Sequence, residues 1–453
     1  MNSVSREKML HGSIPKLILI LSIPAVISNL ISNIYNLVDT FFVSSLGISE
    51  SGATGVIFTL MAIFQAISFM LGQGAGTIVS RRLAVKNNKN ANAYASISFI
   101  SSIIIGLLFL IFGLIFLKPL CLALGSTDTV LPYAMDYGKY ILMAAPAIMS
   151  SIVLNNILRY EGKTFLGMIG LTIGAITNIA LDPICMYTLN LGIAGAGLAT
   201  MVSQYLSLFI LLILFIKKSE CKLIISNVKE YFKVFASICK NGMPSLVRQG
   251  LNSISSGTLN HFAGLYGDYC LSAISIANRI TGFLVSIGIG IGQGFQPVAG
   301  FNYEVKKYDR LKQAFNFMLI LSVGVFVVSS LICLFFSTPI MDLFTESEKV
   351  IDLGSKMLLY TSIGLLFLPV SAGANMLFQS TGKSFVASFL ACLRNGLCFI
   401  PCLVGFYFLF NEEGIVMATG IADILAGVIS LPFIISYFKN LNKNDVNDPL
   451  IEK

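Results

Sequence analysis

The stretch KLILILSIPAVISNLISNIYNLVDTFFVSSL, residues 16–46, carries one lysine at its start and one aspartate, Asp39, far inside an uncharged run. As a helix, a run of this length crosses a bilayer core of about 30 Å. An ionised carboxylate within hydrocarbon costs at least a few kcal/mol, even on lenient insertion scales. Asp39 therefore either lies outside the lipid or is kept there for a function.

The composition of the whole chain extends this interpretation. The 453 residues are 55% hydrophobic and only 11% charged, with a mean hydropathy of +0.82. Soluble domains carry about 25% charged residues. Apolar stretches of membrane-spanning length recur, whereas the short alternating segments of a membrane β-barrel do not. We expect an all-α integral membrane protein, with no cleavable signal peptide before its first apolar run.

Apolar runs separated by polar residues predict twelve transmembrane helices. Pro24, Pro146, Pro244, Pro297 and Pro369 lie inside these runs and are the expected kink points. The predicted helices span residues 14–45, 53–80, 91–117, 129–159, 164–187, 193–216, 233–263, 271–301, 311–337, 349–380, 384–409 and 415–438.

The basic residues predict the orientation of these helices. Most of the 30 Lys and Arg residues lie in the two tails and in alternate loops, such as RRLAVKNNK, RYEGK and EVKKYDRLK. The opposite loops carry few basic residues and several acidic ones. By the positive-inside rule, both termini are cytoplasmic. The net charge of +8 is thus a topology signal, and we expect no nucleic-acid partner.

The chain repeats itself at an offset of about 220 residues. Six helices per repeat return the chain to the same side of the membrane, so the repeats are parallel. We expect an N-terminal lobe over residues 1–216, a cytoplasmic linker over 217–232 and a C-terminal lobe over 233–453. The paired markers are LGQGAG (71–76) with IGQGFQ (291–296), Pro24 with Pro244, Gly162-Lys163 with Gly382-Lys383, and GAGLAT (195–200) with GIVMAT (414–419).

Several segments together resemble the MATE family, the multidrug and toxic compound extrusion transporters, over about residues 14–438. They are IPAVISNLISNIYNLVDTFFVSSLG, NILRYEGKT, TNIALDPICMY, GMPSLVRQG and IGIGQGFQPVAGFNYE. The resemblance implies twelve helices in two lobes. It also implies export of amphipathic or cationic small molecules in exchange for H⁺ or Na⁺, by alternating access.

In the branch of this family with its cation site in the N-terminal lobe, the site motif falls on Asp39, Asn178, Asp182 and Thr200 here. Tyr35 matches a tyrosine that this branch carries nearby. The residues support the same set, because Asn178 and Asp182 are four apart and share one helix face, as do Tyr35 and Asp39. Carboxylate, amide and hydroxyl oxygens are ligands for a hard cation such as Na⁺. The alternative is an aspartate that only hydrogen-bonds between helices.

The second repeat lacks these carboxylates, since Asp39 corresponds to Leu259, Asn178 to Cys398 and Asp182 to Cys402 at an offset of 220. It carries basic residues instead. Arg248 and Arg394 lie within apolar runs, where they either line a cavity or pair with other groups. Asp423 is either the partner of Arg394 or a second cavity acid.

Together with the acidic residues inside the membrane, the resemblance implies a secondary antiporter in the cell membrane, working as a monomer on small-molecule substrates within the lipid bilayer. No cofactor is expected apart from the coupling ion, H⁺ or Na⁺. The nearest alternative is a flippase for a lipid-linked sugar, which would favour basic residues in its cavity. We do not expect an enzyme, because the GxGD or GxSG elements of intramembrane proteases do not occur and no aspartate cluster for Mg²⁺ does.

Overall fold

A computed structural model describes residues 5–224 and 228–446, and helices make up nearly all of it. It divides into two compact units. Among the described residues, one unit holds residues 27–249 and the other holds residues 6–26 together with 250–446. The two boundaries fall inside long helices, near Pro24 in one helix and near Pro244 in the other. Part of the expected linker 217–232, residues 225–227, and both termini lie outside the described residues.

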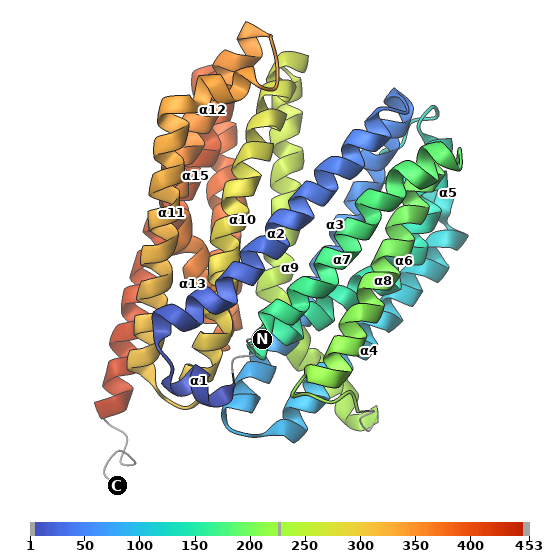
Figure 1. Cartoon of the computed structure of the whole chain (residues 1–453). Coiled ribbons are helices and arrows are strands. Elements are labelled where there is room, and N and C mark those ends of the chain that lie inside the picture. The colour runs from blue at the N-terminus through green and yellow to red at the C-terminus, as the bar shows by residue number, and fades with distance from the viewer. Residues whose placement is uncertain (1–4, 225–227, 447–453) are drawn as a thin grey trace. The chain divides into compact units, whose positions relative to one another are not determined.

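The first unit is built from the following elements: α2 (Ile14–Ser44) from residue 27 on, α3 (Ile48–Ala84), α4 (Asn88–Ile115), α5 (Leu117–Ala123), α6 (Leu131–Tyr160), α7 (Thr164–Pro183), the π-helix η1 (Ile184–Thr188), α8 (Gly192–Lys218) and α9 (Val228–Gly264) up to residue 249. In it, α6 packs against α3, α4 and α8, and α7 packs against α8 (Figure 1).

The second unit contains α1 (Arg6–His11), the start of α2, the rest of α9, α10 (Asp268–Glu304), α11 (Tyr308–Asp342), α12 (Glu348–Leu365), α13 (Leu368–Ser380), α14 (Ser384–Cys392), the π-helix η2 (Leu393–Cys398) and α15 (Phe399–Val446). Here α10, α11 and α12 pack against one another, and α15 packs against α12 and α13.

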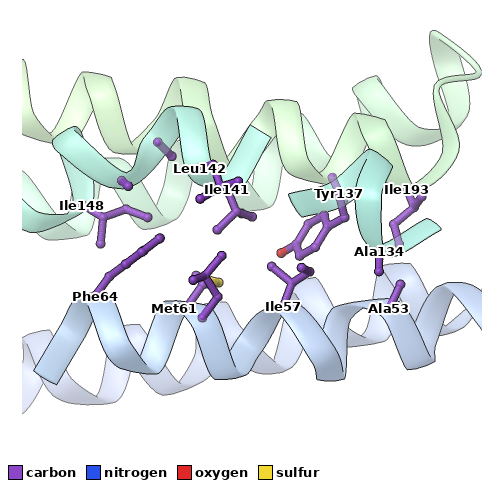
Figure 2. Packing of buried hydrophobic residues seen from close by; sticks show 14 of the residues in the cluster. Ala53, Ile57, Met61, Phe64, Ala134, Tyr137, Ile141, Leu142, Ile148 and Ile193 are labelled. Atoms are coloured by element: carbon purple, nitrogen blue, oxygen red, sulfur yellow. The ribbon is translucent and has the colours of Figure 1, made fainter. Parts of the chain in front are cut away.

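Helix α6 forms the centre of the first unit, because its most apolar window is 83% buried, against 33% for α8. Apolar side chains three and four residues apart line its contact with α3 (Figure 2). Small residues allow close approach as well. A Cβ on Gly106 would lie 2.5 Å from the Cα of Pro146, so α4 and α6 need glycine there.

The number of membrane spans agrees with the sequence prediction of twelve. By length and composition, the described residues contain nine helices able to cross a membrane, or ten if the bent pair α12 and α13 is one span. Helix α9, with 37 residues, is long enough but more polar. The last apolar stretch comprises two helices, since the backbone at Asn411 (φ 54°, ψ −132°) is not helical. When α9 is included and the last stretch is counted as two helices, the described spans come to twelve.

A sharp bend accompanies one of the five prolines. A 48° bend separates α12 from α13, and Pro369 stands in the first turn of α13. The chain runs on as single helices through Pro24, Pro146, Pro244 and Pro297. The short helices α1 and α5 were not predicted. They are only 6 and 7 residues long, too short for a periodic pattern to show.

The backbone repeats along with the sequence. Lys86 and Lys306 both have φ 59°, although neither is a glycine, and they lie 220 residues apart. Gly162 and Gly382 have φ 83° and 79° at the same offset. Equivalent loops of the two repeats therefore turn in the same way, and the predicted two-lobed all-α architecture is confirmed.

Candidate cation site

Three of the predicted site residues meet between α7 and α8. The Asn178 amide donates to Asp182 Oδ1 at 3.2 Å and lies 3.3 Å from Thr200 Oγ1. Asn178 and Asp182 are one turn apart on α7, so their side chains share a face. All three residues are at most 1% exposed. They meet because α7 and α8 pack closely, with only 2.8 Å between a Cβ built on Gly174 and the Cβ of Ser207.

The two predicted residues of α2 reach the same cluster. Asp39 is close enough to Asp182 for the two carboxylates to repel each other. Tyr35 lies near Thr200 and feels the charges of both aspartates. The structure thus brings together all five side chains that the sequence singled out, from α2, α7 and α8.

Three acceptor atoms in this cluster are buried and have no hydrogen-bond partner in the described part of the chain. They are Oδ1 of Asp39, Oδ1 of Asn178 and Oδ2 of Asp182. Buried acceptors without a donor are costly and uncommon in folded proteins. A bound cation or a proton would satisfy such atoms. These carboxylate and amide oxygens are therefore suitable ligands for a hard cation. Among the described residues, no group of three or more His, Cys, Asp or Glu side chains could hold a metal ion.

Sequence reasoning missed Tyr137 of α6. This residue is 2% exposed, lies near Thr200, and feels the charges of Asp39 and Asp182. Figure 2 shows its ring pointing from α6 toward α3, next to Ile57. In sequence it follows the apolar period of α6, so it could not be told from a core residue. Gln204, which Tyr35 also reaches, lies one turn beyond Thr200, and that spacing is the signal that could have found it.

The basic residues of the second half lie in different units. Arg248 belongs to the first unit, where its Nη2 lies 3.5 Å from Gln73 Oε1, the atom that also accepts from Ser245. Arg394 belongs to the second unit and pairs with Asp423 through two contacts, Nε to Oδ1 at 2.6 Å and Nη2 to Oδ2 at 3.3 Å.

The fold and the site define a two-lobed transporter, and comparison with known proteins identifies its family. The MatE family model matches residues 24–184 and again 244–404, which repeats the 220-residue offset. The chain belongs to the MATE family, a family of transporters and not of enzymes.

Its relatives can be aligned with nearly the whole chain. The chain is 26% identical to the multidrug export protein MepA of Staphylococcus haemolyticus (strain JCSC1435), over 95% of both proteins. It is 27% identical to MepA of Staphylococcus aureus (strain MRSA252), over 90% of this chain and 91% of the relative. A multidrug resistance MATE transporter of the MOP superfamily, solved in an outward-facing conformation, has a TM-score of 0.89 at 25% identity and covers 98% of this chain and 99% of its own.

Proposed function

We propose that this multi-pass membrane protein exports amphipathic or cationic small molecules in exchange for H⁺ or Na⁺ by alternating access. The observation that carries the proposal is the group of three buried, partnerless acceptor atoms at Asp39, Asn178 and Asp182. The relatives named multidrug export proteins support the substrate class. Since the site is built within residues 27–249 of one chain, we take the monomer as the working unit.

In this proposal Asp39, Asn178, Asp182 and Thr200 bind the coupling ion, and Tyr35 orients Thr200. Two ionised carboxylates near each other oppose their own removal from water. A bound cation neutralises them and favours closing of the site. A ligand shifts a conformational equilibrium only by its different affinity for the two states. Ion binding from outside therefore promotes drug release, and by linkage a bound drug weakens ion binding by the same factor.

The distribution of basic residues supports an orientation with both termini in the cytoplasm. The loop that holds Lys86 and the turn at Gly162 would then lie on the cytoplasmic side. Cysteines introduced at residues 86–90 should react from the cytoplasm and those at 346–349 from outside. Labelling of both segments from one side would contradict the orientation.

Transport assays in vesicles test the site. Asp39→Asn and Asp182→Asn should each abolish gradient-driven efflux while the protein still inserts in the membrane. The matched controls are Leu259→Ala and Cys402→Ala at the repeat-related positions, which should keep coupled efflux. Equal loss in both sets would argue against a cation site in the first repeat.

A second measurement identifies the ion. Drug affinity is titrated against pH and against Na⁺, in the wild type and in Asp39→Asn. We expect one of the two ions to weaken drug binding in the wild type, and the dependence to disappear in the variant. A wild-type affinity indifferent to both ions would refute the coupling scheme. The flippase alternative, whose pyrophosphate would need several unbalanced basic residues, gains no support from the single pair of Arg394 with Asp423.

A further inference from the structure

The second unit contains a polar cavity of about 310 Å³. Its walls come from α9, α10, α12, η2 and α15, all at residues beyond 250. Amide and hydroxyl side chains make up much of the lining, and the ion pair of Arg394 with Asp423 is part of the wall. A polar cavity with a few convergent groups has the character of a small-molecule site.

The ion pair leaves part of its arginine free. Asp423 is almost fully buried, and both of its oxygens accept from Arg394, through Nε and Nη2. The side chain of Arg394 is 26% exposed, and its Nη1 makes no hydrogen bond in the described part of the chain. Since Arg394 lines the cavity, this nitrogen offers two N–H donors for a ligand.

Two hydroxyl groups of the same lining also lack partners. Thr361 on α12 is 3% exposed, and its Oγ1 is buried without a hydrogen-bond partner among the described residues. The same is true of Oγ1 of Thr419 on α15. A buried hydroxyl that donates to nothing is costly. Both residues line the cavity, so rotation of either side chain would bring its hydroxyl to a ligand with acceptor oxygens.

The cavity occupies the place in the second repeat that the cation site occupies in the first. Leu259 and Thr419, which line it, are the counterparts of Asp39 and Thr200. In the first repeat the unsatisfied groups are carboxylate and amide oxygens, which accept. In the second they are hydroxyls and a guanidinium edge, which can donate. The two repeats therefore present opposite chemistry at equivalent places.

The local helix geometry also differs between the two repeats. Arg394 lies in the π-helix η2, and π-turns inside helices are frequent at functional sites. The Ser255 hydroxyl of α9 donates to the backbone carbonyl of Asn395 in this segment. The counterpart of Arg394 in the first repeat is Gly174, which lies against Ser207 and leaves no room for a side chain. The arginine and the cavity thus occur together in the second repeat.

We propose that this cavity binds the carboxylate of a small anionic or zwitterionic molecule, held by Nη1 of Arg394 and by the hydroxyls of Thr361 and Thr419. Arg is suited to this role because its planar N–H groups match carboxylate geometry. Asp423 holds the guanidinium in place and balances its charge. The site is separate from the proposed cation site, so its test needs no ion gradient and can fail independently.

The test is equilibrium binding by calorimetry to the purified full chain in lipid nanodiscs, with benzoate, benzamide and benzylammonium as probes. These share one ring and differ in head group. We expect benzoate to bind with a Kd on the order of 1 mM, a typical value for so small a ligand. Benzamide should bind at least tenfold more weakly, and benzylammonium should not compete with benzoate. Equal binding of benzoate and benzylammonium would overturn the proposal.

Variants locate the binding. The double variant Arg394→Gln/Asp423→Asn removes both charges, so that no lone charge stays buried, and it should lose benzoate binding at least tenfold. Gly55→Ala, where an added Cβ meets nothing within 4 Å, is the control and should bind benzoate as the wild type does. Because the chain has no tryptophan, Phe399→Trp places a single fluorescent reporter in the cavity lining. No change in its emission on adding benzoate would refute the site, even if the double variant fails to fold.

Discussion

Replacing Glu161 by alanine should release the segment 219–224, which follows α8. Glu161 caps the end of α6, and its side chain is fully buried. Its carboxylate accepts from Ser219 Oγ at 2.6 Å and from the backbone N–H groups of Glu220 and Cys221 at 3.0 and 3.2 Å. This one side chain therefore holds the first half of the segment.

The size of the effect follows from these contacts. A hydrogen bond to a charged group contributes about 1.5–3 kcal/mol, although several bonds to one group do not simply add. Lys163 would also lose Glu161, which lies 3.5 Å away, but it keeps Glu220 at 3.8 Å and the Lys218 carbonyl at 2.6 Å, so its charge is not left alone. The freed backbone groups can reach water, which lowers the total. We expect the segment to lose on the order of 3 kcal/mol, or about a hundredfold in its opening equilibrium.

Limited trypsin digestion measures this opening, because Lys222 lies within the segment. Cleavage through a transiently open state follows the population of that state. Glu161→Ala should be cut after Lys222 about a hundredfold faster than the wild type, and Glu161→Gln at an intermediate rate. The control is Thr381→Ala at the repeat-related position, which loses only bonds to the Leu377 and Phe378 carbonyls of the preceding helix. Equal cleavage of wild type and Glu161→Ala would refute the reasoning.

Three further predictions concern local packing and backbone. Gly76→Ala should destabilise the fold by about 1–3 kcal/mol, because its Cβ would lie 2.1 Å from the Tyr160 ring. Gly55→Ala in the same helix meets nothing within 4 Å and should be neutral or stabilising. Thermal unfolding in detergent compares the two variants. Lys86→Gly should raise the melting temperature by relieving about 1 kcal/mol of strain at φ 59°, and a lower one would contradict this. Burial, with a carboxylate nearby, raises the pKa of Cys221, so its thiol should stay protonated and react slowly with maleimide at neutral pH; labelling as fast as a free thiol would disprove it.

The sequence alone predicted the spans well, because bilayer thickness fixes the length of an apolar run. The twelve runs correspond to the helices found, and their ends differ by several residues. The helix predicted over 53–80, for example, extends from Ile48 to Ala84. Polar residues at a helix end do not mark where its hydrogen bonding stops, so such boundaries are the least predictable feature.

The site was predictable where it lies within single helices. Asn178 and Asp182 share a face of one helix, which their spacing indicates. Tyr137 was not predictable, since its role depends on how α6 packs against α8. For Arg394 and Asp423, which lie 29 residues apart, the sequence left pairing as one of two alternatives, because the choice depends on tertiary structure. Contacts between helices require the packing, and the periodicity of one sequence does not contain it.

The division of α2 and α9 between the two units has a consequence for the origin of the chain. The residues up to 26 pack with the second repeat, and those of α9 up to 249 pack with the first. An ancestor with a single repeat would have kept its leading helix end unpacked unless two copies exchanged these ends, as domain-swapped dimers do. Fusion of two such copies would turn that exchange between chains into one within a chain, where the connection gives a high effective concentration. Neither half, expressed alone, would then contain a complete folding unit.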